Sequence, residues 1–294
     1  MLEIKNISKS FGNYAVLKQC SLSVEKGSIF GLVGINGAGK STLLRTIAGV
    51  YEADEGVVLF DGHDTHLEDK VRKDILLIAD DPYFEKHTTI ETMKDYYRSF
   101  YDFDELIFDK YLKMFGLNPK KALVEFSKGM KRQAFLLFAL AIKPKLLLLD
   151  EAFDGLDPLI RYNFKKALAE LIEDYEITVI ISSHNLKELE DICDSFGILE
   201  NGYIKTSGDL NASKDMINKY QLAYDHEVSL DIFNNLDIMS SNISGRVITL
   251  VIKGDVEEVK AELMATNPII LDVLAINFEE LFIYEVESRG MLDE

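Results

Sequence analysis

Cysteine is scarce in this 294-residue sequence, which contains only Cys20 and Cys193. Neither cysteine has the spacing to further ligands that metal sites use, so a cysteine-bound metal is not expected. We expect two packed thiols in a reduced, cytoplasmic setting.

Long apolar runs are also missing. The longest, from Ala134 to Ile142, is about half the length that a helix needs to cross a bilayer. Residues Met1 to Lys5 do not combine a basic region with an apolar core, so no signal peptide is expected. We therefore expect no direct membrane insertion. If the protein works in transport, a separate chain must provide the pore.

Basic residues are outnumbered by acidic ones. The chain has 32 Lys and Arg against 50 Asp and Glu, a formal net charge of −18. An acidic surface repels the phosphates of nucleic acids and anionic lipid headgroups, so neither is an expected partner. The excess is concentrated in residues 211–294, where 6 basic residues face 16 acidic ones.

Short apolar segments alternate with helical ones along residues 1–210, which favours an α/β fold with a mainly parallel sheet. Between about 80 and 135 the pattern becomes helical and rich in aromatic residues, which predicts a helical subdomain. The expected strands are residues 2–8, 20–25, 29–33, 57–60, 74–78, 146–149 and 178–181, and the expected helices are residues 41–49, 159–175 and 186–194.

Residues 211–294 form a second pattern. We expect strands at 228–233, 246–253 and 269–274, and helices at 256–264 and 278–287. This predicts a small α+β appendage, βαβ-like and of roughly ferredoxin-like proportions.

A glycine-rich motif separates an expected strand from an expected helix. It reads Gly34-Ile35-Asn36-Gly37-Ala38-Gly39-Lys40-Ser41 and is followed by Thr42. This is the phosphate-loop pattern of P-loop NTPases, whose glycines let backbone N–H groups approach a phosphate closely. We expect the motif to bind ATP. Lys40 would reach the β- and γ-phosphate oxygens, and the Ser41 hydroxyl would bind Mg²⁺.

Two adjacent carboxylates, Asp150 and Glu151, follow the apolar strand of four leucines. At the end of a strand beside a phosphate loop, Asp150 is expected to hold Mg²⁺ directly or through water. Glu151 is then placed to orient or deprotonate the attacking water. Such a pair on its own would indicate no more than a solvated loop.

The segment Phe126-Ser127-Lys128-Gly129-Met130-Lys131-Arg132-Gln133 ends 17 residues before Asp150. It resembles the signature motif of ATP-binding-cassette (ABC) proteins, and further motifs of that family follow in order over residues 1–210. Phe11 resembles the aromatic residue that stacks on adenine, with a core aromatic as the less favoured alternative. Gly155-Leu156-Asp157 resembles the D-loop, and Ser183-His184 resembles the switch histidine.

The resemblance implies that two ATPase domains close around two ATP molecules. Each nucleotide would lie between the phosphate loop of one domain and Ser127 and Gly129 of the other, at a helix N-terminus that favours anions. His184 would contact the γ-phosphate from the first domain. The second domain could belong to another copy of this chain or to a relative.

Four residues depart from the family pattern, and one of them is Met130, where the family often has glutamine or glutamate. Lys128 stands where a second glycine is usual, and Ala152 replaces a usual proline. Asp80 stands where the family places a glutamine that senses Mg²⁺, so Asp80 is a further candidate metal ligand. Because Lys40, Asp150, Glu151 and His184 are present, we expect an active ATPase.

The resemblance implies the ATPase subunit of a transporter that powers a separate integral membrane permease, and the motif style resembles bacterial exporters of drugs, bacteriocins or lipid-like compounds. Tyr83 and Phe84 are candidates for docking to the permease, whereas core packing would equally explain the aromatic stretch. The subunit is expected to be peripheral at the inner face of the membrane. A soluble ABC ATPase of an assembly complex and a slowly hydrolysing nucleotide-binding regulator are alternatives.

Overall fold

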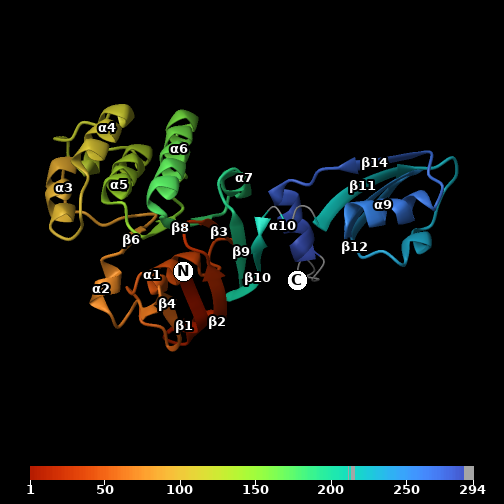
Figure 1. Cartoon of the computed structure of the whole chain (residues 1–294), viewed down its shortest axis with the longest axis horizontal. Helices are drawn as coiled ribbons and strands as arrows, with labels where there is room; N and C mark the ends of the chain where they lie inside the picture. The colour runs from red at the N-terminus through yellow and green to blue at the C-terminus, as the bar shows by residue number, and fades with distance from the viewer. Residues whose placement is uncertain (211, 213–215, 288–294) are drawn as a thin grey trace. The chain divides into compact units, whose positions relative to one another are not determined.

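The computed structural model describes residues 1–210, 212 and 216–287, and its elements run from β1 at the N-terminus to α10 (Figure 1). The contacts divide the chain into two compact units, Met1–Ser207 and a second that begins at Gly208. Each unit is described by itself.

The first unit contains two sheets. An antiparallel sheet has the order β2-β1-β4-β5, with β1 Leu2–Phe11, β2 Tyr14–Val24, β4 Glu55–Phe60 and β5 His63–Asp64. The other sheet has the order β10-β9-β3-β8-β7-β6, with β3 Ile29–Val33, β6 Ile75–Ile78, β7 Leu146–Asp150, β8 Thr178–Ser183, β9 Ser195–Glu200 and β10 Tyr203–Asp209. Strands β9, β3, β8, β7 and β6 run parallel.

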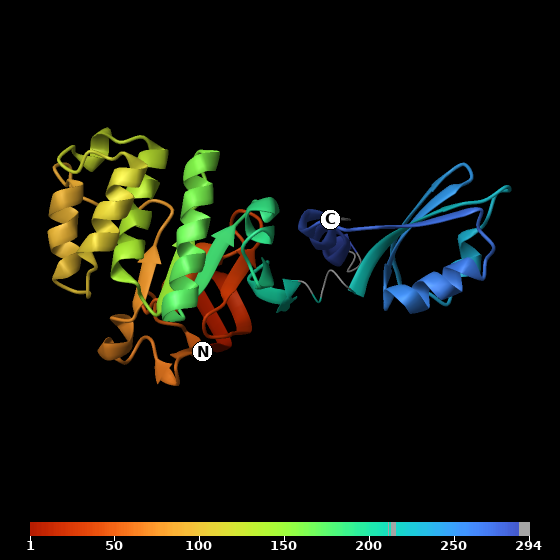
Figure 2. The same ribbon diagram turned by 45° about the horizontal axis from the view of Figure 1, so that its top comes forward.

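The first unit has seven α-helices in the described part of the chain. They are α1 Lys40–Ile47, α2 Asp69–Arg72, α3 Ile90–Arg98, α4 Glu105–Phe115, α5 Lys128–Ile142, α6 Pro158–Tyr175 and α7 Leu186–Glu190, with a 3₁₀ turn η1 at Leu123–Glu125. The yellow and green helices α3 to α6 lie side by side in both ribbon views (Figures 1 and 2). Asp157 begins α6, because its carboxylate accepts hydrogen bonds from the backbone N–H groups of Leu159 and Ile160.

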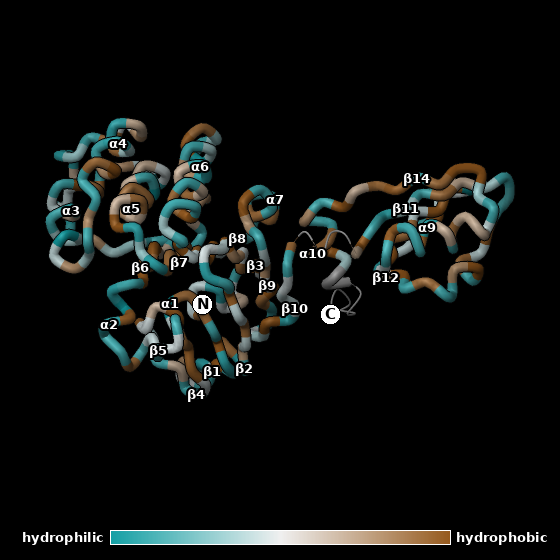
Figure 3. The backbone as a smooth tube through the Cα atoms, viewed as in Figure 1, coloured by the Kyte–Doolittle hydropathy of each residue, from teal (hydrophilic) through white to brown (hydrophobic). Residues whose placement is uncertain are grey.

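The core explains why the parallel strands are so apolar. All five residues of β7 are buried, and the tube is brown near its label in Figure 3. Leu146 and Leu148 pack in one cluster with Leu43 and Leu44 of α1, so the helix after the glycine-rich motif is pinned against the sheet. The sheet therefore positions the motif.

The second unit holds a four-stranded antiparallel sheet of order β12-β13-β11-β14. Its elements are β11 Ile217–Ala223, η2 Leu230–Phe233, β12 Ile238–Ser244, β13 Val247–Lys253, α9 Val256–Met264, β14 Ile270–Leu274 and α10 Phe278–Glu287. Strands β13 and β14 run in the same direction with β11 between them and α9 connecting them, which is a split βαβ unit. The expected small α+β appendage is present.

Two expectations about single elements are wrong. Residues 228–233 are not a strand, because Ser229 caps the 3₁₀ turn Leu230–Phe233 and Phe233 is buried in the core of this unit. The helix expected to reach Asp194 ends at Glu190. Beyond it, Asp194 exchanges hydrogen bonds with the backbone of Ile29, which places the start of β9 beside β3.

Candidate functional site

The glycine-rich motif connects β3 to α1. A side chain at Gly34 would place its Cβ 2.4 Å from the carbonyl oxygen of Leu199, so only glycine fits there. Gly39 has a φ of 110° at the start of α1, a conformation that suits glycine. The first N–H groups of α1 have no partner within the helix and face the motif, which creates an anion-binding site.

Lys40 is almost completely buried, and its Nζ donates a 2.7 Å hydrogen bond to the carbonyl oxygen of Gly34. A pocket of about 300 Å³ lies beside this lysine. Of the expected nucleotide-binding residues Asn36, Gly37, Gly39, Lys40, Ser41 and Thr42 line it, together with Asp80 and Glu151. Gly34 and Ala38 lie in the same turn without lining the pocket.

The two carboxylates at the end of β7 are held differently. Asp150 is 2% exposed and accepts a 2.7 Å hydrogen bond from the Ser182 hydroxyl of the neighbouring strand β8. Glu151 has a φ of 50°, and its backbone N–H donates to both the carbonyl and the hydroxyl oxygen of Ser182. Ser182 therefore orients both acids, a role that the sequence interpretation missed. Its place directly before Ser183-His184 was the available signal.

Glu151 connects the phosphate loop to the histidine. Its Oε1 lies 3.3 Å from Lys40 Nζ, and its Oε2 lies 2.8 Å from His184 Nδ1. These residues come from the carboxyl ends of β7, β3 and β8, which are neighbours in the sheet. Parallel strands end at one edge, and this edge brings a cation, a carboxylate and an imidazole together. Lys40 and Glu151 line the pocket, whereas His184 does not line it and contacts Glu151.

The signature segment begins α5 and lies outside this pocket. The Ser127 hydroxyl accepts a hydrogen bond from the Met130 N–H at 3.2 Å, so Ser127 is the N-cap of the helix. Gly129 lies against the backbone of Gly155, where an added Cβ would be 2.6 Å from the carbonyl oxygen. The start of α5 is thus fitted to the loop that follows Glu151.

Two aromatic residues lie near the turn between β1 and β2. Phe11 is 47% exposed and packs edge-on against Tyr51, with ring centroids 5.3 Å apart, but it does not line the phosphate-loop pocket. Tyr14, which pairs with Phe11 across the turn, does line it. Tyr14 is a candidate contact to a bound base that the sequence interpretation overlooked.

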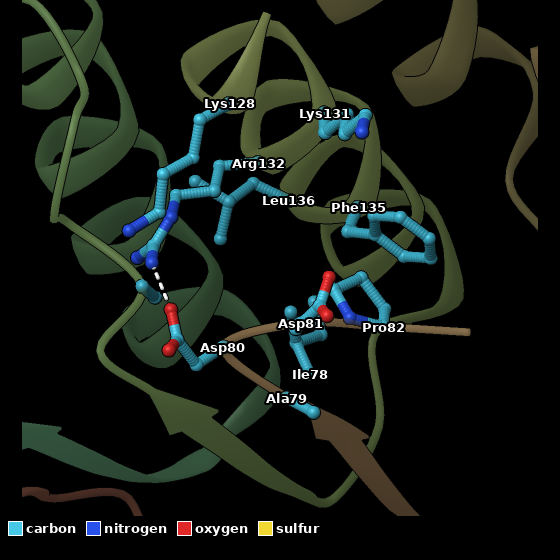
Figure 4. Close-up of a pocket in the computed structure, with 11 residues that line it drawn as sticks. Ile78, Ala79, Asp80, Asp81, Pro82, Lys128, Lys131, Arg132, Phe135 and Leu136 are labelled. Atoms are coloured by element: carbon cyan, nitrogen blue, oxygen red, sulfur yellow. Dashed lines mark hydrogen bonds and ion pairs between the residues drawn. The ribbon is translucent and has the colours of Figure 1, made fainter. Parts of the chain in front are cut away.

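Asp80 follows β6 and lies between two pockets. Besides the phosphate-loop pocket, it lines a cavity of about 310 Å³ together with Arg132 and Phe135 of α5 (Figure 4). Its carboxylate forms an ion pair with the guanidinium of Arg132. Asp80, expected as a metal ligand, thus has a protein cation as its partner.

A phosphate loop between a strand and a helix, with two acids at the end of a parallel strand of the same sheet, defines a P-loop ATPase. The ABC transporter family model matches residues 17–154. The ABC transporter ATP-binding protein YtrB of Bacillus subtilis is 33% identical over 96% of this chain and 97% of its own length. The chain therefore belongs to the ABC transporter ATP-binding protein family, whose cassettes bind and hydrolyse ATP.

Other matches agree on the class. The lantibiotic transport ATP-binding protein SrtF of Streptococcus pyogenes is 31% identical over 74% of this chain and 94% of its own length. A solved ATP-binding subunit of an ABC transporter is 29% identical, with a TM-score of 0.66, over 73% of this chain and 92% of that one. Among the described helices, none is both long enough and apolar enough to span a membrane.

Proposed function

We propose that this chain is the MgATP-hydrolysing subunit of an exporter, held at the inner face of the membrane by a separate permease. The observation that supports ATP hydrolysis is the contact of Glu151 with both Lys40 and His184. A carboxylate in this position can orient or deprotonate the water that attacks the γ-phosphate. Lys40 and His184 would then hold the phosphate oxygens.

The side chains of Ser41 and Asp150 would bind Mg²⁺. The Asp150 carboxylate is buried and oriented by Ser182, and hydroxyl and carboxylate oxygens are ligands that Mg²⁺ prefers. No cluster of three or more His, Cys, Asp or Glu suited to a metal occurs in the described part of the chain. This suits an ion that takes its remaining ligands from phosphate and water. When bound, Mg²⁺ offsets the charge of the phosphates.

The proposed working unit contains a second ATPase domain. Ser127 and Gly129 sit at the N-terminus of α5 but outside their own chain's phosphate-loop pocket. The free N–H groups of that helix start attract anions. They are therefore available to the ATP of a partner domain.

Export is favoured by the relative that is named for lantibiotic transport. YtrB and the lantibiotic transport protein SrtF are covered over 97% and 94% of their lengths. Relatives named for import, such as the sulfate/thiosulfate protein CysA and the methionine protein MetN, are covered over 61–68%. The match to YtrB thus extends over nearly the full length of both chains, whereas the match to SrtF covers 74% of this chain.

The permease would dock beside the cavity next to Asp80. Tyr83 is 89% exposed at the end of this segment, whereas Phe84 is half-buried and stacks on Phe135 with ring centroids 6.3 Å apart. Further along the aromatic stretch, Phe108 and Tyr111 are buried in the helical subdomain. Tyr83 is therefore the better docking residue, whereas Phe84, Phe108 and Tyr111 support the core.

Residues 211–294 would regulate or dimerise the ATPase. The match to YtrB extends over 284 residues and so includes most of this region, whereas the family model ends at residue 154. Deletion of residues 211–294 is expected to change the ATPase rate, the oligomeric state or permease binding. If all three stayed unchanged, this part of the proposal would be wrong.

The first experiment compares the wild type with Glu151→Gln. The variant should lose about 100-fold or more in kcat while it retains ATP binding, because the amide cannot accept the proton of water. Glu173→Gln, at an exposed position of α6, is the matched control and should leave kcat unchanged.

The transport part is tested in the native host. The tagged chain should co-purify in fixed stoichiometry with a polytopic membrane protein after gentle solubilisation. Inverted membrane vesicles that contain this complex should accumulate substrate when ATP is added outside, since their outer face is the cytoplasmic one. A chain that stayed free of membrane proteins under crosslinking would point instead to a soluble ATPase complex.

A further inference from the structure

Two departures from the family pattern, Asp80 and Lys128, belong to one set of ion pairs. Asp80 is bonded to the guanidinium of Arg132 (Figure 4). The same Nη2 of Arg132 lies 3.6 Å from Asp154 Oδ2, and Lys128 Nζ lies 2.7 Å from that oxygen. Four charged side chains, two of each sign, thus form a continuous network, which we call the Asp80–Lys128 network.

Arg132 is the buried member. Its side chain is 6% exposed, and Nε and Nη1 have no hydrogen-bond partner in the described structure. A guanidinium removed from water has to be compensated by carboxylates, so Arg132 holds Asp80 and Asp154 strongly in place. The hydrogen bond from Lys128 also lowers the pKa of Asp154.

The network ties together three segments of the chain. Asp80 follows β6, Lys128 and Arg132 lie in the first two turns of α5, and Asp154 lies in the loop after the end of β7. Asp80 also lines the phosphate-loop pocket. The position of the signature helix is therefore linked to the edge of the ATP site by charge pairs.

We propose that Asp80 and Arg132 are positioning residues that hold the start of α5 in register with the nucleotide pocket, and that Asp80 does not ligate Mg²⁺. The proposal rests on the ATPase mechanism proposed above. A metal at Asp80 would compete with Arg132 for the same carboxylate and leave the buried guanidinium poorly compensated. The equal numbers of positive and negative charges in the network instead let Arg132 stay buried while Lys128 replaces the usual glycine.

The test compares Asp80→Asn, Arg132→Met and the double variant by kcat and by the Mg²⁺ concentration that half-saturates ATP binding. Binding is measured with a fluorescent ATP analogue in the Glu151→Gln background, which suppresses turnover. Each single variant should lower kcat about tenfold, and the double variant should be no slower than either. The half-saturating Mg²⁺ concentration should stay within about twofold of that of the parent protein.

Controls separate positioning from folding. Asp81→Asn changes the adjacent carboxylate, which lines the cavity in Figure 4 but not the phosphate-loop pocket, and should keep the parent kcat. Asp80→Glu retains the charge and should recover most of the activity lost in Asp80→Asn. If Arg132→Met does not fold, the Asp80 variants still decide the question, because the Asp80 side chain is half-exposed and its replacement should not prevent folding.

A rise of about tenfold or more in half-saturating Mg²⁺ for Asp80→Asn alone would make Asp80 a metal ligand and overturn the proposal. Additive losses in the double variant, or an unchanged kcat in Asp80→Asn, would also overturn it. If instead the parent protein neither bound nor hydrolysed ATP, the proposed function itself would fail.

Discussion

A partly buried ion pair close to His184 offers a direct test of how the site is held. Arg161 Nη1 of α6 lies 2.8 Å from Glu188 Oε1 of α7. The other carboxylate oxygen of Glu188 accepts a hydrogen bond from the Ser183 hydroxyl at 3.3 Å. Because Ser183 directly precedes His184, the pair connects the start of α6 to the histidine segment.

We expect Glu188→Leu to destabilise the first unit. Glu188 is 7% exposed and Arg161 is 30% exposed, so removal of the carboxylate leaves a guanidinium that water reaches only in part. Breaking a fully buried pair costs about 3–5 kcal/mol, and partial exposure reduces the expected loss to about 2–3 kcal/mol. For a unit of this size the loss corresponds to a fall in Tm of about 4–12 °C.

Differential scanning calorimetry of the full chain measures this fall. The transition of the first unit is identified by its upward shift when ATP is added, since ATP stabilises the state that binds it. The double variant Arg161→Met/Glu188→Leu should recover at least half of the loss, because no charge is then left unpaired. Glu173→Gln at an exposed site of α6 should stay within about 0.5 kcal/mol of the wild type.

A Tm of Glu188→Leu within about 2 °C of the wild type would refute the reasoning, because the pair would then contribute almost nothing. So would a double variant as unstable as the sum of the two single ones. That result would mean that Arg161 and Glu188 act independently.

Two further predictions concern the nucleotide site. Gly129→Ala should lower kcat and stability, because the added Cβ would lie 2.6 Å from the Gly155 carbonyl oxygen. Overpacking of this kind costs about 1–3 kcal/mol. A steady-state ATPase assay and a thermal melt that both matched the wild type would contradict this prediction. Tyr14→Ala should weaken ATP binding about fivefold or more in a fluorescence titration, since Tyr14 lines the pocket and an aromatic contact contributes about 1 kcal/mol. A larger loss of affinity in Phe11→Ala than in Tyr14→Ala would show that Phe11, and not Tyr14, contacts adenine.

Local patterns in the sequence were sufficient to predict the elements whose pattern lies within a few consecutive residues. The phosphate-loop motif and the run of four leucines before Asp150 each combine strand, turn and chemistry within a few residues, and the structure has β3, α1 and β7 at those places. The helix expected at 256–264 has those bounds in the structure, since its apolar residues recur with a helical period. Membership of the ABC class followed from the order of such motifs.

Mixed or weak patterns misled the interpretation in the second unit. Strands β11 and β12 were not expected, because lysine, asparagine and serine interrupt their apolar alternation. Residues 228–233 have enough apolar side chains for a strand, but the burial of Phe233 in the core and the cap at Ser229 favour a 3₁₀ turn. Pairing with distant strands outweighs local preference in such segments.

Only the tertiary structure decided which charged and polar side chains meet. Asp80 and Arg132 are 52 residues apart, and Ser182 reaches Asp150 across 32. Partners at these separations depend on the order of strands in the sheet and on where α5 begins, and no local period encodes either. The sequence by itself therefore determined the class of the protein, the position of its phosphate loop and the two acids Asp150 and Glu151. The fold determined that Glu151 contacts both Lys40 and His184 and that Asp80 pairs with Arg132. Lys40 and Arg132 are buried, and a buried charge is stable only when an opposite charge or a hydrogen bond compensates it.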